Sequence, residues 1–147
     1  MEKDEIPKVI KPEDLPEPII EYRSRNYRRR KCPKCGKGCY RDSKGHRTLH
    51  DLGDLRTGKP HDIKFVYSKH RCETDKIYFN TDMSDIAPIG SNYTHRVVTL
   101  AVQLVIEDGL PLRSASWHLW RDHKVYVPFG TVQNWIEDAG KKNNGEN

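Results

Sequence analysis

The string CPKCG at residues 32–36 constrains the fold more than any other feature, because it places two cysteines in one tight turn. Cys32 and Cys35 have the spacing at which two thiolates converge on one tetrahedral metal ion, and Gly36 adds backbone freedom after the second thiolate. The other ligands must come from a distant segment. We therefore expect the middle of the chain to fold around Zn²⁺.

Cys72 is the only cysteine after residue 39, so a second pair of thiolates is missing. Asp75 stands where the second cysteine of such a pair would be, and a carboxylate is an accepted zinc ligand. Cys39 is a better donor, but it would put three ligands on one short loop, whereas His70 would approach from the strand that carries Cys72. The sequence predicts three thiolate ligands and leaves the fourth open among these three residues and another histidine; the remaining alternative is that no metal binds.

The charge of the chain is unevenly distributed. The net charge is +5, yet residues 1–21 carry three lysines and seven acids, whereas residues 23–31 carry six positive charges and no negative one. With 35% hydrophobic and 32% charged residues, we favour two small modules over one larger core. The prediction is a disordered, proline-containing acidic tail over 1–22, followed by a basic arm over 23–31.

The basic arm is either a solvated linker or a segment that contacts phosphates. Its arginines flank Tyr22 and Tyr27, a composition that suits contact with a nucleic-acid backbone and stacking on bases. The candidate phosphate-binding residues are Arg25, Arg28, Arg29, Arg30 and Lys31.

Residues 32–81 read as three or four short antiparallel strands. Ile63, Phe65 and Tyr67 alternate with residues that can face solvent, as in a half-buried strand. A sheet this small is marginal by itself, and zinc ligation that contributes on the order of 10 kcal/mol would stabilise it. The expected turns lie at 42–45, 56–60 and 73–76, and we interpret 32–81 as a zinc-ribbon-like module.

The C-terminal third has a helical pattern. Val97, Ala101 and Leu104 fall on one stripe, which Gly109 and Pro111 end. The predicted helices span 93–108, 112–123 and from 128 or 129 to 139, after a linker at 82–92.

Three helices in this order have the outline of a helix-turn-helix domain, which we place at 93–142 with a disordered tail at 143–147. The alternative is a plain three-helix domain. In the first case the third helix would enter a major groove, with Thr131, Gln133 and Asn134 reading base edges. Lys141 and Lys142 could then meet phosphates.

CPKCG, together with HRTLHDLGDLRTGKP at 46–60, KFVYSKHRC at 64–72 and GTVQNWIEDAGKK at 130–142, resembles the N-terminal region of prokaryotic insertion-sequence transposases. The resemblance implies an α+β fold, in which a small zinc-ribbon-like antiparallel β module precedes a three-helix helix-turn-helix domain. It also implies binding of double-stranded DNA at the terminal inverted repeats of a transposon, as a step in DNA transposition and recombination.

In that family a catalytic RNase H-like domain follows, and it would start where this chain ends, at Asn147. We therefore expect no enzyme activity from the chain, which resembles an isolated or truncated end-recognition piece. Two alternatives remain: a small transcription regulator, which would be a homodimer on a palindromic site, and a zinc ribbon that binds proteins or RNA.

The chain has neither an apolar run of about 18 residues, which a membrane span requires, nor the apolar core of a secretion signal. We expect a cytoplasmic, nucleoid-associated protein without a membrane partner. In a reducing compartment the cysteine pair favours metal binding over disulfide formation.

Overall fold

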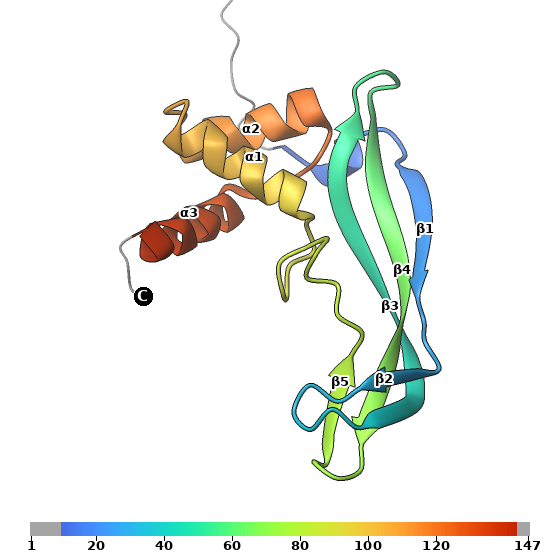
Figure 1. Cartoon of the computed structure of the whole chain (residues 1–147). Coiled ribbons are helices and arrows are strands. Elements are labelled where there is room, and N and C mark those ends of the chain that lie inside the picture. Colours follow the sequence, from blue (N-terminus) through green and yellow to red (C-terminus); the bar gives the residue numbers. More distant parts are fainter. Residues whose placement is uncertain (1–9, 144–147) are drawn as a thin grey trace, which may run out of the picture.

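The computed structural model describes residues 10–143, with side chains as far as residue 141, and places a five-stranded sheet before three helices (Figure 1). The predicted α+β class is therefore confirmed. In chain order the elements are the 3-10 turn η1 (Pro12–Asp14), β1 (Ile19–Arg25), β2 (Arg29–Lys31), β3 (Gly38–Asp54), β4 (Lys59–Cys72), β5 (Ile77–Asn80), α1 (His95–Ile106), α2 (Leu112–His123) and α3 (Phe129–Asn143).

The two longest strands, β3 and β4, form an antiparallel hairpin at the centre of the sheet. The predicted turn at 42–45 is wrong, because β3 continues through these residues with only an irregularity between Arg41 and Ser43. Gly45 does not form a turn. It leaves room for the ring of Tyr67 on β4, because a Cβ atom at this position would lie 2.5 Å from that ring. The expected turns that follow β3 and β4 are present.

The N-terminal segment belongs to the sheet. Strand β1 pairs in parallel with β4, and β2 pairs antiparallel with β3. The prediction of a disordered tail over 1–22 is therefore wrong from residue 10 onward, while residues 1–9 lie outside the described part; the basic arm at 23–31 is ordered by pairing with the hairpin. The physical reason is that the edges of the β3–β4 hairpin carry unpaired backbone groups, which this segment satisfies despite its prolines and charges.

The three helices pack around a small apolar core, as their periodicity predicts. Val97 and Leu104 of α1, Leu119 of α2 and Val132 of α3 are buried together. The link between α2 and α3 is apolar because its side chains join this core, as Val127 does. Within the described residues, none of the helices has the length and apolarity needed to cross a membrane.

The helices are docked on the sheet by a buried carboxylate. Asp51 of β3 accepts hydrogen bonds from the hydroxyl of Thr94, at 2.8 Å, and from the guanidinium of Arg96, at 3.2 Å, both at the start of α1. Nearby, a Cβ atom on Gly53 would lie 2.6 Å from the Cβ of Lys124, at the end of α2. Because the backbones approach this closely, the two modules predicted from the sequence share an interface.

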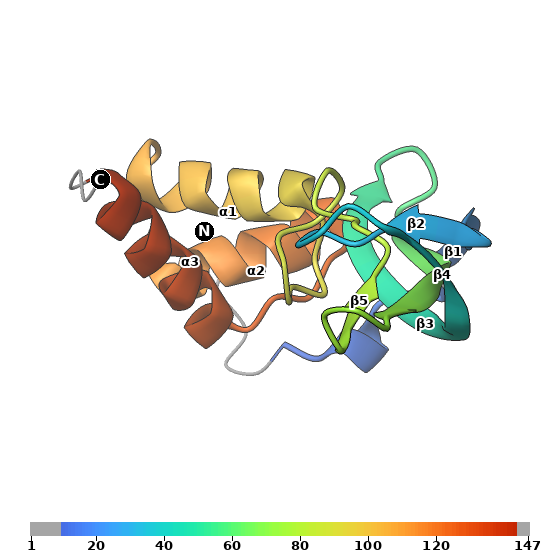
Figure 2. The same ribbon diagram turned by 60° about the horizontal axis from the view of Figure 1, so that its bottom comes forward.

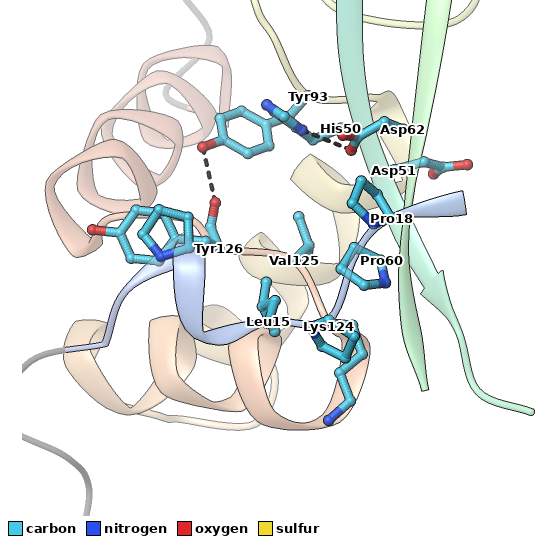
Figure 3. A pocket seen from close by; sticks show the side chains of 12 residues that line it. Leu15, Pro18, His50, Asp51, Pro60, Asp62, Tyr93, Lys124, Val125 and Tyr126 are labelled. Atoms are coloured by element: carbon cyan, nitrogen blue, oxygen red, sulfur yellow. Dashed lines mark hydrogen bonds and ion pairs between the residues drawn. The ribbon is translucent and has the colours of Figure 1, made fainter. Parts of the chain in front are cut away.

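The segment around η1 covers one side of this interface. It encloses a crevice of about 270 Å³ together with the sheet and the α2–α3 link, and Leu15, Pro60 and Val125 line it (Figure 3). The hydroxyl of Tyr93 donates a hydrogen bond to the backbone oxygen of Tyr126 across the crevice, at 3.0 Å. The indole N–H of Trp120 on α2 donates to the carbonyl of Lys11 at 3.0 Å, so the N-terminal segment is also bonded to the helices.

Candidate metal centre and basic surface

Two tight turns of the same kind face each other at the end of the sheet. In the first turn, between β2 and β3, the N–H of Gly36 donates to the carbonyl of Cys32 at 2.9 Å. In the second, between β4 and β5, the N–H of Lys76 donates to the carbonyl of Cys72 at 2.8 Å. Gly36 and Lys76 both have a positive φ, of 77° and 57°, so the second turn repeats the first without a glycine.

These turns bring four ligand atoms together. The side-chain donors of Cys32, Cys35, Cys72 and Asp75 all lie within 4.8 Å of one another. The Cys35 and Cys72 sulfurs are 3.7 Å apart, close to the roughly 3.8 Å that two Zn–S bonds of 2.3 Å make in a tetrahedron. The Cys32 sulfur lies 3.2 Å from an oxygen of Asp75. The four side chains are therefore close enough to hold a metal ion.

The other two candidates for the fourth ligand lie outside this group. Cys39 is buried beside it, with its thiol directed to the carbonyl of Lys37 at 3.4 Å. Both ring nitrogens of the buried His70 are engaged, one with the carbonyl of Cys39 at 3.0 Å and the other with the hydroxyl of Ser68 at 2.8 Å. Of the three alternatives, Asp75 is the one that the structure brings to the ligand group.

The surroundings favour negative charge on some members of the ligand group and oppose it on another. The backbone N–H of Asp75 lowers the pKa of the Cys72 thiol, and hydrogen bonds from the Cys35 and Cys32 thiols lower the pKa of the Asp75 carboxyl. The backbone N–H of Lys37 favours the Cys35 thiolate, but Asp75 and the neighbouring thiols outweigh it and raise the pKa of Cys35 to about 12. A metal ion must therefore displace the Cys35 proton when it binds.

Arg25, one of the predicted DNA contacts, is already paired within the protein. Its guanidinium forms two hydrogen bonds with the carboxylate of Asp85, at 2.7 and 2.8 Å, and a third with the carbonyl of Asp82 at 3.0 Å. This fork ties the end of β1 to the 82–92 segment and uses the donors that a phosphate would need. We therefore leave Arg25 out of the proposed DNA surface.

The Arg25–Asp85 pair predicts a pH-dependent stability. Arg25 lowers the pKa of Asp85 to about 2, so the pair stabilises the fold above the usual carboxyl pKa of 3.8 and ceases to do so as the pH falls towards 2. Asp85→Asn should destabilise the protein by a constant amount above about pH 5, and the difference from wild type should shrink below about pH 4. Urea unfolding of both proteins at matched pH measures this, since metal loss in acid is common to both.

A difference in the free energy of unfolding that persists unchanged at about pH 2 would contradict the assigned role of the pair.

The other four predicted phosphate contacts lie on β2 and just before it. Arg28, Arg29, Arg30 and Lys31 are all exposed, and within residues 10–141 none of them forms an ion pair. Arg30 stacks on the ring of Tyr27, with its guanidinium carbon 4.1 Å from the ring centre. The arm is thus an ordered cationic surface beside the metal-ligand group.

The predicted base-reading residues are on α3 as expected. Gln133, Asn134 and Lys141 are exposed, and Thr131 is half-buried. The side chain of Lys142 lies outside the described residues. In Figure 2, α3 lies to the left and β2 and β5 lie to the right, with the loop of residues 82–92 between them.

Sequence reasoning missed Tyr40, which lies beneath the guanidinium of Arg29 at 4.9 Å from the ring centre. No local signal identifies this contact, because it depends on the register in which β2 pairs with β3.

Comparison of the chain with protein-family models, with curated proteins and with solved structures finds no match. The functional assignment rests on the ligand group and the charged surface described above.

Proposed function

We propose that this chain is a zinc-stabilised protein that binds double-stranded DNA with sequence specificity. The sheet end acts as a zinc-ribbon-like module that contacts the phosphates, and the helices act as a helix-turn-helix unit that reads base edges.

The donor set favours zinc among the metals that proteins bind. Three sulfur donors and one carboxylate select a soft or borderline ion, whereas Mg²⁺ and Ca²⁺ prefer oxygen ligands throughout. Four protein ligands leave no open position, as in structural zinc sites. Cys32, Cys35, Cys72 and Asp75 would hold the ion, and its role is to link the two turns.

The observation that carries the proposal is the run of exposed cations at Arg28, Arg30 and Lys31, which have no ion-pair partner among residues 10–141. Arg30 and Lys31 lie on β2 and Arg28 comes just before it; β2 is an edge strand that pairs with β3 and leads directly into the turn that carries Cys32 and Cys35. Cations without a carboxylate partner inside the protein are available to phosphates, and a row of them suits a polyanion such as DNA. The pI of 9.0 agrees with this partner.

The helices supply a second, base-reading surface. Lys124, the residue after α2, takes a left-handed conformation, and the chain changes direction there before α3 begins at Phe129. The first turns of α3 expose Gln133 and Asn134, whose amide groups can form paired hydrogen bonds with adenine. The resemblance to transposase N-terminal regions supports a finer proposal, namely that the bound sequence is the terminal inverted repeat of a transposon.

Selection of duplexes from a random pool by the zinc-loaded protein tests the proposal. At about 150 mM salt, where non-specific binding is weak, we expect one motif to be enriched. Asn134→Ala should lose about 1–3 kcal/mol at one base position of that motif. Gln103→Ala, which removes an exposed amide from α1, is the matched control and should bind like wild type.

Absence of any enriched motif would contradict sequence-specific binding. An enriched palindrome bound by a stable dimer would contradict the transposon-end proposal in favour of a transcription regulator. An asymmetric motif bound by a monomer would support end recognition.

A further inference from the structure

Arginine and tyrosine side chains alternate across four strands at the end of the sheet. Arg29 of β2 lies directly opposite Tyr40 of β3, and Arg71 of β4 lies directly opposite Tyr78 of β5. Arg41 of β3 pairs with His70 of β4, so continuing this antiparallel register by one residue places Tyr40 beside Arg71. We name Arg29, Tyr40, Arg71 and Tyr78 the arginine–tyrosine ladder.

The ladder lies on the face of the sheet opposite the buried ligand module. Successive residues of a strand point to opposite faces, so Tyr40 and Arg71 point away from the buried side chains of Cys39, His70 and Cys72. Tyr40 is 60% exposed and Tyr78 is 66% exposed. In the described part of the chain nothing covers this row of rings, and a protein that leaves two large rings open has a surface suited to a partner.

Each tyrosine of the ladder is held by an arginine. The guanidinium carbon of Arg29 is 4.9 Å from the centre of the Tyr40 ring, and that of Arg71 is 5.7 Å from the Tyr78 ring. These cation–π contacts restrict the rings in advance of binding and keep positive charge beside them. Gly38 contributes to this order, because a Cβ atom there would lie 2.3 Å from the Arg29 guanidinium.

A hollow of about 390 Å³ lies between the second and third members of the ladder. Tyr40 and Arg71 line it together with Lys37 and Thr74, which are joined by a hydrogen bond of 3.1 Å. Glu73 also lines the hollow, and it accepts hydrogen bonds from Arg71 at 3.0 and 3.2 Å. The hollow therefore combines an aromatic wall with polar and mostly cationic groups.

We propose that the arginine–tyrosine ladder binds unpaired nucleotides of single-stranded nucleic acid, with bases stacked on Tyr40 and Tyr78 and phosphates between Arg29 and Arg71. Alternation of rings and cations across neighbouring strands matches the alternation of bases and phosphates along a single strand. Bases in a duplex are already stacked on one another and cannot reach the rings. The proposal thus goes beyond duplex recognition and does not depend on α3.

The alternative partner for this cationic surface is an acidic protein. Lys31, two residues along β2 from Arg29 and on the same face, extends the positive charge of the ladder, while the acids beside it are Glu73, engaged by Arg71, and Asp42. An acidic peptide could use the cations but has no bases to stack on the rings, so it would leave the tyrosines unused. Dependence of binding on the rings therefore separates the two partners.

The experiment measures the affinity of the zinc-loaded protein for a fluorescent oligo-dT of about 15 nucleotides and for an abasic oligomer of the same length and charge. Wild type should bind oligo-dT more tightly than the abasic oligomer. Tyr40→Ala and Tyr78→Ala should each weaken binding to oligo-dT about 5- to 100-fold, and Tyr78→Phe should retain it. Leu55→Ala, which removes a 73% exposed apolar side chain from the β3–β4 turn outside the ladder, is the control and should bind like wild type.

Equal affinity for the abasic oligomer, or unchanged oligo-dT binding in both tyrosine variants, would overturn the proposal. Tighter binding of polyglutamate than of oligo-dT would overturn it in favour of an acidic protein partner. Because Tyr78 lies outside the proposed duplex surface, Tyr78→Ala should still select the wild-type duplex motif. Failure of the ladder is therefore distinguishable from failure of the proposed function.

Discussion

Cys32→Ser is expected to abolish stoichiometric zinc binding and to unfold the end of the sheet that carries β2, β5 and both turns. Structural zinc contributes on the order of 10 kcal/mol in small zinc modules, more than any other interaction in this region. The local core consists of three cysteines with Ile77 and Phe79 packed against it, which is too little apolar surface to hold the two turns together.

The rest of the protein should remain folded in this variant. The part of the β3–β4 hairpin that lies away from the ligand group has its own core of Leu49, Ile63 and Phe65. The three helices pack around a separate core. Amide hydrogen exchange should therefore become fast at residues 29–41 and 68–80 and stay slow in α1 to α3. Zinc content measured by atomic spectroscopy on the same samples completes the test.

Cys39→Ala is the matched control, because this cysteine is buried beside the ligand group without belonging to it. The variant should keep one zinc ion and the wild-type exchange pattern. Loss of zinc in Cys39→Ala would make Cys39 a ligand in place of Asp75. Retained zinc and unchanged exchange in Cys32→Ser would refute the metal centre.

Replacing Arg28, Arg30 and Lys31 together by alanine is expected to weaken binding to every duplex alike. Each phosphate contact contributes about 0.9 to the slope of log K against log salt concentration, so the slope should fall by about 2.7. Between about 50 and 200 mM salt, wild type should therefore lose roughly 40-fold more affinity than the variant. Fluorescence anisotropy with one labelled duplex over a series of salt concentrations measures both slopes.

A control with the same change in charge uses three exposed lysines of the central hairpin, Lys44, Lys59 and Lys64, replaced by alanine. Its salt dependence should stay close to that of wild type. If both triple variants reduced the slope of log K against log salt concentration equally, net charge, and not the cationic surface on β2, would control DNA binding.

The helical part of the fold could be predicted closely from the sequence, and the N-terminal part could not. Residues 112–123 were predicted as a helix and form α2 with the same bounds, because helix periodicity and the flanking proline are local signals. The pairing of β1 with β4 is not local. It depends on a hairpin edge that forms about 40 residues further along the chain, as the partnership of Ile19 with His61 illustrates.

Only part of the candidate metal site could be predicted from the sequence, because only part of it depends on residues that are close together in the chain. The spacing of Cys32 and Cys35 is a property of one turn, so three thiolate ligands could be named from the sequence. The choice of Asp75 over Cys39 and His70 required the geometry of the second turn, where Lys76 takes the conformation that Gly36 has in the first. Likewise, nothing near Arg25 in the sequence indicates its pairing with Asp85.

The sequence by itself determined the cysteine pair, the helical periodicity and the concentration of positive charge at 28–31, because each depends on residues close together in the chain. Only the tertiary structure decided which cations are free, which fourth side chain meets the thiolates and which tyrosines stand beside arginines. These depend on the register of strands whose residues, such as Arg29 and Tyr78, are far apart in sequence, and register is set by the packing of the whole sheet.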